Sequence, residues 1–73
     1  MNEMIKTWLI EMLDKEIKET NGNISNNVLW AHGSHTELEA EMFTQNITSL
    51  EEYKEVLLKL KKQVLDEELK ICL

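Results

Sequence analysis

The sequence contains no proline, only two glycines and no arginine, since all eight basic residues are lysine. Proline and glycine are the strongest helix breakers, so their scarcity favours an all-α fold over sheet or irregular structure. Without arginine the chain lacks the usual reader of guanine edges and the two-pronged clamp for phosphate. With 14 acidic residues and a formal charge of −6, we expect neither nucleic acid nor membrane among its partners.

The chain also lacks any apolar run of 18 residues and has a single cysteine, Cys72. A membrane-spanning helix needs about 20 apolar residues, and one cysteine cannot form an internal disulfide. The start at Met1 is not the basic and apolar start of a signal peptide. These features predict a cytoplasmic protein in a reducing environment. Residues 1–73 make a single domain, which is too short to bury much apolar surface alone.

The middle of the chain carries signals for the end of one helix and the start of another. Gly33 has the character of a helix C-terminal cap, which glycine occupies in the left-handed conformation without a Cβ clash. Ser34 and Glu37 have the spacing of a capping box, in which each residue satisfies a free backbone N–H. Thr36 and Glu39 repeat that spacing, so the second helix has two candidate starts.

Apolar residues recur at steps of three and four on both sides of this turn, which marks one face of a helix on each arm. The sequence predicts a helix over about 2–32, a turn at 33–35 and a helix over about 36–70. The arms fold into a long antiparallel hairpin, each helix being roughly 45–50 Å long at 1.5 Å per residue. The expected register pairs Ala31 with Leu38, Leu13 with Val56, Leu9 with Leu60, and Ile5 with Val64.

Each arm has a weak place where a helix break is the alternative. Gly22 costs roughly 1 kcal/mol relative to alanine in a helix, and Asn21-Gly22 has turn character, with Ser25 as the start of a further short helix. In the second arm, repeated capping-box spacings make a break near Asn46 the alternative. Because the apolar stripe keeps its phase through both places, we expect two continuous helices.

The apolar surface of the arms is wider than one partner helix covers. Left exposed, such a surface promotes aggregation, and natural proteins use it for contacts. We therefore expect a homo-oligomer, a dimer or higher, whose hairpins complete a four-helix bundle; the alternative is that the surplus face binds a different protein. The residues predicted for this interface are Met4, Trp8, Met12, Trp30, Phe43, Ile47 and Tyr53.

No motif indicates catalysis or a cofactor. His32 and His35 lie near Glu37 and Glu39, but zinc takes three or four ligands and Cys72 is expected at the far end of the hairpin, so we predict no metal site. The glutamates of the second arm alternate with lysines at helical spacing, which indicates a solvated face. Without a catalytic triad, a phosphate-binding loop or a glycine fingerprint, we predict that the protein is not an enzyme and holds no cofactor.

The chain is rich in lysine, asparagine and isoleucine, as proteins of low-GC genomes are, and it carries Asn23-Ile24, Leu29-Trp30-Ala31, Gly33, Met42, Asn46-Ile47 and Leu50-Glu51-Glu52-Tyr53. In these segments it resembles small helix-hairpin proteins of phages, prophages and plasmids of low-GC Gram-positive bacteria. Its architecture is similar to the plasmid Rop hairpin dimer, without the basic RNA-binding face. The resemblance implies a mobile-element protein that inhibits a host enzyme or blunts host defence.

These observations favour a protein that works by binding. The leading hypothesis is a non-enzymatic, acidic helical adaptor or inhibitor of a host or phage protein, such as a counter-defence protein. The alternative is an oligomer that sequesters a small signalling nucleotide, which would need cationic donors such as Lys6, Lys15 or Lys18. A purely structural dimer is the third hypothesis.

Overall fold

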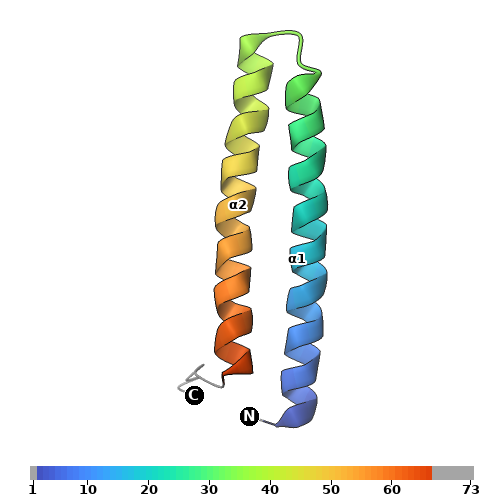
Figure 1. Ribbon diagram of the computed structural model, residues 1–73, viewed down its shortest axis with the longest axis vertical. Coiled ribbons are helices and arrows are strands. Elements are labelled where there is room, and N and C mark those ends of the chain that lie inside the picture. Colours follow the sequence, from blue (N-terminus) through green and yellow to red (C-terminus); the bar gives the residue numbers. More distant parts are fainter. Residues whose placement is uncertain (1, 67–73) are drawn as a thin grey trace.

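The computed structural model describes residues 2–66, which form two α-helices, α1 (Glu3–His32) and α2 (Glu37–Leu65). The helices lie side by side and antiparallel as an extended hairpin, so that the start of α1 and the end of α2 share one end (Figure 1). The hairpin measures 51 × 20 × 17 Å, and residues 2–66 contain no strand. The predicted all-α hairpin is thereby confirmed.

Two further sequence expectations concern the ends of the chain and the membrane. The extension of the second helix to about residue 70, together with Met1 and Cys72, lies outside the described residues. Neither described helix combines the length and the apolar character that crossing a membrane requires.

Both helices are continuous through the places where a break was the alternative. The backbone of α1 is helical through Gly22, and that of α2 is helical through Asn46, as the unbroken apolar phase predicts. At the start of α1, the side chain of Asn2 accepts a hydrogen bond from the backbone N–H of Met4 at 2.8 Å. This cap satisfies one of the free N–H groups of the first turn.

The end of α1 differs from the sequence prediction. Gly33 has φ −88° and ψ 5°, so the predicted left-handed cap is wrong. Its N–H donates to the carbonyl of Leu29 at 3.0 Å, and the N–H of Ser34 donates to that of Ala31 at 3.3 Å. The hydroxyl of Ser34 donates to the carbonyl of Trp30 at 2.9 Å. Because a right-handed backbone and a serine side chain already satisfy these carbonyls, Gly33 has no need of a positive φ.

The second helix begins at the later of its two predicted starts. The side chain of Thr36 accepts the N–H of Glu39 at 3.2 Å, and the carboxylate of Glu39 accepts the N–H of His35 at 3.2 Å. This arrangement is similar to a capping box, except that the carboxylate of Glu39 reaches the N–H of His35, the residue before the cap. Glu37 is the first helical residue, where the positive end of the helix dipole stabilises its carboxylate. Ser34, the other candidate, closes α1 instead.

The seam between the helices is narrow and contains few buried apolar side chains. Among residues 2–66, only the apolar side chains of Leu57 and Val64 are buried, with 5% and 2% of their surface exposed. The inward positions of α2 recur at alternate steps of three and four, which is heptad spacing. They are Ala40, Phe43, Ile47, Leu50, Lys54, Leu57, Lys61 and Val64.

The register predicted from the sequence is wrong by about one helical turn. The ring centroids of Trp30 and Phe43 lie 5.8 Å apart, and the side-chain amide of Asn46 donates to that of Asn27 at 3.3 Å. These two contacts pair α1 with later residues of α2 than expected, whereas the hydrogen bond between Tyr53 and Glu16 lies at the expected register. Four residues that the prediction placed in the seam are exposed instead: Ile5, Leu38, Val56 and Leu60.

Two lysines explain this difference. Lys54 and Lys61 occupy inward positions of α2 and are half-buried. A lysine can line a seam with its methylene stem while its ammonium group reaches the edge, and Lys61 forms an ion pair there with Asp14 of α1. A search for apolar residues alone rejects a stripe with two lysines and selects the neighbouring stripe.

We expect Thr36→Ala to lower the free energy of unfolding by about 1 kcal/mol, because it removes the acceptor for the N–H of Glu39. Gly33→Ala is the control. Its added Cβ would lie 3.6 Å from the carbonyl oxygen of Leu29, an ordinary contact, so stability should stay equal or rise slightly. Urea unfolding followed by circular dichroism, at one protein concentration, measures both. A larger loss for Gly33→Ala would contradict the observed turn.

Candidate functional site

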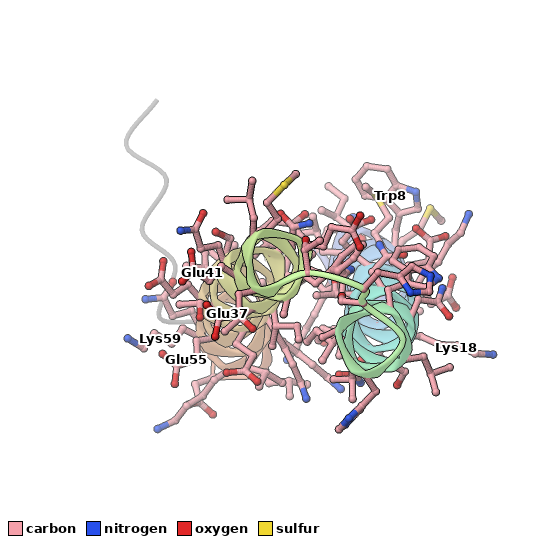
Figure 2. The ribbon with its side chains drawn as sticks, turned by 90° about the horizontal axis from the view of Figure 1, so that it is seen from above. Trp8, Lys18, Glu37, Glu41, Glu55 and Lys59 are labelled. Carbon is pink, nitrogen blue, oxygen red and sulfur yellow. The ribbon has the colours of Figure 1, made fainter. Side chains whose placement is uncertain are left out.

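Nine of the fourteen exposed large apolar side chains of residues 2–66 lie along one side of the hairpin. Figure 2 shows Trp8 projecting from this side, whereas Lys18 projects from the outer side of α1, and Glu55 and Lys59 from the outer side of α2. We call this side the apolar face. Its nine large side chains, each at least 36% exposed, are Ile5, Trp8, Met12, Trp30, Leu38, Met42, Tyr53, Val56 and Leu60.

Helical spacing places these side chains together. Trp8 and Trp30 are 22 residues apart, which is close to six full turns at 3.6 residues per turn. Glu16 follows Met12 by one turn and connects the two helices, since it accepts a hydrogen bond from the hydroxyl of Tyr53 at 3.1 Å. The exposed stripes of α1 and α2 therefore lie on the same side of the hairpin.

The apolar face has two apolar ends and a polar middle. Near the start of α1, Trp8 and Met12 are 57% and 51% exposed, and near the turn Trp30 and Met42 are 54% and 58% exposed. Between these ends lies an open hollow of about 300 Å³, and four of its five lining residues are polar. Its lining residues are Asn23, Asn27, Asn46, Ser49 and Leu50.

Two polar side chains of α1 are buried in the seam. The hydroxyl of Thr20, which is 2% exposed, donates to the carbonyl of Glu16 at 2.7 Å. The amide of Asn27, which is 7% exposed, donates to the carbonyl of Asn23 at 2.8 Å and accepts from Asn46. Within residues 2–66 no buried side-chain polar atom lacks a partner. These groups therefore cost little desolvation energy, but they add no apolar burial.

The residues predicted for an interface fall into two groups. Phe43 and Ile47 are half-buried at inward positions of α2, so they belong to the seam of the hairpin itself. The sequence reasoning missed Ile5, Leu38, Met42, Val56 and Leu60 because it assigned their stripe to the seam. The role of the other predicted residues at an interface stays a prediction, and each of them is at least 44% exposed: Met4, Trp8, Met12, Trp30 and Tyr53.

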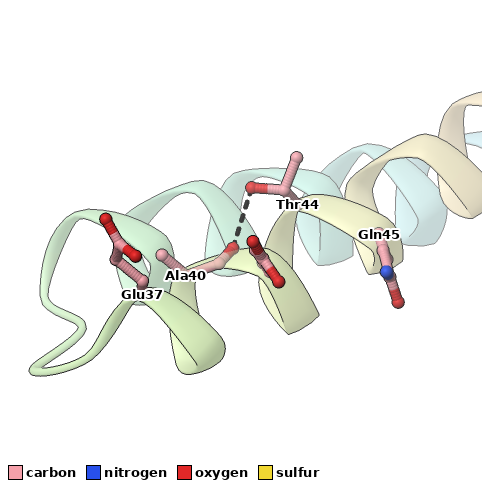
Figure 3. Close-up of a pocket in the computed structure, with 5 residues that line it drawn as sticks. Glu37, Ala40, Thr44 and Gln45 are labelled. Carbon is pink, nitrogen blue, oxygen red and sulfur yellow. Dashed lines mark hydrogen bonds between the residues drawn. The ribbon is translucent and has the colours of Figure 1, made fainter.

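A second hollow lies at the start of α2, on a side of that helix other than the apolar face (Figure 3). It is open, and its walls include the carboxylates of Glu37 and Glu41 together with Ala40, Thr44 and Gln45. The hydroxyl of Thr44 donates to the carbonyl of Ala40 at 2.8 Å. Two carboxylates and no cation face this hollow, so its electrostatics oppose an anionic ligand such as a nucleotide.

The two histidines lie at the turn. His32 is the last residue of α1 and His35 lies between the helices, and both are exposed. Among residues 2–66, no three side chains of histidine, cysteine, aspartate or glutamate are grouped so that they could hold a metal ion. The expectation of no metal at His32 and His35 stays a prediction.

Comparison of the chain with protein-family models, with curated proteins and with solved structures finds no match. The resemblance to mobile-element hairpin proteins therefore stays a prediction.

The contact between Tyr53 and Glu16 predicts a pH dependence. The hydrogen bond to Glu16, together with desolvation and the charge of that carboxylate, raises the pKa of Tyr53 above 10.0. Because the folded pKa is raised, the contact stabilises the hairpin below pH 10 and is lost as the pH rises through the folded pKa.

Tyr53 is the single tyrosine, so phenolate absorbance reports its titration alone. We expect a midpoint above 10.0, and we expect Glu16→Ala to bring the midpoint down. Glu19→Ala removes a nearby exposed carboxylate without this hydrogen bond, so it is the matched control. Equal midpoints for wild type and Glu16→Ala would contradict the contact.

Proposed function

We propose that the protein is a non-enzymatic, acidic interaction module that acts as an adaptor or inhibitor by binding another protein. In this proposal two copies of the hairpin pair as a homodimeric four-helix bundle. The observation that carries the proposal is the contrast between two buried apolar side chains, Leu57 and Val64, and fourteen exposed large ones among residues 2–66. Exposed apolar surface on this scale is typical of an interaction surface.

The energetics of a single hairpin support pairing. Helices are marginal in water, and most of their stability in proteins comes from packing an apolar face. Covering the nine side chains of the apolar face would contribute on the order of 10 kcal/mol per chain, at roughly 1 kcal/mol for each half-exposed side chain. A second layer of helices is the simplest source of such burial.

The dimensions of the hairpin also fit a dimer interface. A face of 51 × 20 Å offers on the order of 1,000 Å² per chain, whereas a standard stable interface buries about 800 Å² per partner. The methionines on the face add adaptable contacts, because their side chains are flexible and polarizable.

The outer sides of the hairpin suggest the partner. Glu41 and Glu55 project from the outer side of α2, and Glu37 lies on the side of α2 away from Trp8 (Figure 2); a dimer would carry twice the formal charge of −6. A surface of this sign steers association with a basic patch on another protein. We therefore propose a host or phage protein with a basic patch as the partner, which fits a counter-defence inhibitor of a mobile element. A purely structural dimer is the alternative that the same packing supports.

We expect Trp8→Glu to dissociate the dimer while much of the helical content is retained, because an unpaired charge in an apolar contact costs several kcal/mol. Lys18→Gln is the matched control, since it changes the net charge by the same amount on the outer side of α1 (Figure 2). Sedimentation and circular dichroism report the two quantities. A wild-type chain that sediments as an 8.6 kDa monomer at high micromolar concentration would refute the homodimer.

Partner binding is tested by capture from an extract of the native host. Wild type should enrich one specific protein, and the triple variant Glu37→Gln, Glu41→Gln, Glu55→Gln should lose it, because the variant removes three charges from α2. Small molecules extracted from the purified protein provide the second measurement. A co-purifying nucleotide without a captured protein would replace the adaptor proposal by the nucleotide-sequestering one.

A further inference from the structure

The apolar face has a protruding end and a hollow end. Trp8 projects from the face near the start of α1 (Figure 2). Near the turn, an open hollow of about 270 Å³ has Trp30 and Phe43 in its walls. Their rings are tilted by 48° with centroids 5.8 Å apart. The hollow is open and lies near the lower limit of the 300–1,000 Å³ that is typical of small-molecule pockets, and a single large side chain can enter it.

The protruding tryptophan and the hollow lie at matching distances from opposite ends of the hairpin. At one end α1 extends beyond α2, and at the turn α2 extends beyond α1 (Figure 1). Trp8 follows Glu3 by five residues and Phe43 follows Glu37 by six, so each lies about 8 Å from its end at 1.5 Å per residue. A second hairpin, turned end over end and laid on the apolar face, would overlap it along its full length.

We propose that a second copy of this chain covers the apolar face in antiparallel orientation, with Trp8 of each copy seated against Trp30 and Phe43 of the other. This inference rests on the proposed homodimer and adds its orientation and its anchor. Trp8 and Trp30 both lie on α1, so the two α1 helices pack against each other across the two-fold axis. The contact is isologous, since each copy supplies one protrusion and one hollow. Three aromatic rings then meet at each end, and tilted aromatic pairs are a favoured packing arrangement.

The distribution of charge favours the antiparallel orientation. The end formed by residues 2–14 and 57–66 has four lysines and four acidic residues, whereas the turn end, residues 24–46, has three glutamates and no lysine. An antiparallel pair places the end of each copy that carries lysines beside the glutamates of the other. A parallel pair would gather Glu37, Glu39 and Glu41 of both copies at one end of the bundle, and such an accumulation of like charge is unfavourable.

Distances between spin labels decide the orientation. In a Cys72→Ser background, which leaves the chain no other thiol, Glu37→Cys and Glu55→Cys each carry one label on α2, away from the apolar face that Trp8 marks (Figure 2). Glu37 lies at the turn end, and Glu55 lies near the middle of the hairpin. An antiparallel dimer should separate the Glu37 labels by on the order of 50 Å. The Glu55 labels should lie within about 30 Å in either orientation, which is the width of a four-helix bundle with its labels.

Each outcome of this experiment decides a different point. A long distance at Glu37 with a short one at Glu55 supports the antiparallel dimer. Short distances at both positions would overturn the antiparallel orientation while the homodimer stands. The absence of any distance between chains at both positions would overturn the homodimer and this inference together.

The contact of Trp8 with the other copy is tested by a double-mutant cycle, in which the dissociation constant of the dimer is measured. If Trp8 packs against Trp30 of the other copy, Trp8→Ala and Trp30→Ala should each weaken the dimer about tenfold or more, and the double variant should weaken it by less than the product. Trp8→Ala with Leu38→Ala is the control pair, which should be additive. Additive effects for Trp8 and Trp30 would place Trp8 elsewhere on the partner.

Discussion

The rest of this structure depends on a seam that is narrow and interrupted by polar side chains. Thr20 and Asn27 are buried at inward positions of α1, and Lys54 and Lys61 are half-buried at those of α2. Hydrogen bonds satisfy the first two, so the helices can pack without an unpaired buried group. Each of these residues, however, replaces an apolar side chain that would otherwise be buried. Apolar burial must therefore come from outside the hairpin, and the apolar face supplies the surface for it.

The same polar side chains explain why one register is chosen. Along the hairpin, Asn46 meets Asn27, Tyr53 meets Glu16, and Lys61 meets Asp14. Each contact is partly or fully exposed and is worth little by itself. A slip of one turn towards the predicted register would separate Lys61 from Asp14 and would move the buried amide of Asn27 away from Asn46. The seam thus has the character of a coiled coil in which polar positions reduce stability and increase specificity.

The sequence predicts the hairpin better than it predicts the packing of the hairpin. Helix type, continuity through Gly22 and the Thr36 cap follow from local signals, because caps and apolar periodicity act within a few residues. The register does not follow, since α2 has two apolar stripes about a quarter turn apart and apolar content alone favours the stripe without lysines. The same choice between stripes explains why two neighbouring residues were each assigned to the wrong surface in the candidate site. Phe43 belongs to the seam, and Met42 belongs to the apolar face.

The apolar face and the acidic outer side of α2 suggest that self-association and partner binding use different residues. In the proposed dimer the apolar face is covered, while the glutamates on the outer side of α2 are displayed twice, related by the two-fold axis. A partner that is itself two-fold symmetric could then engage both copies, and the second contact would form at a high effective concentration. For a chain with such a small core, dimerisation would thus serve two purposes. It would provide the apolar burial that one hairpin lacks, and it would double an acidic surface on which each single contact is weak.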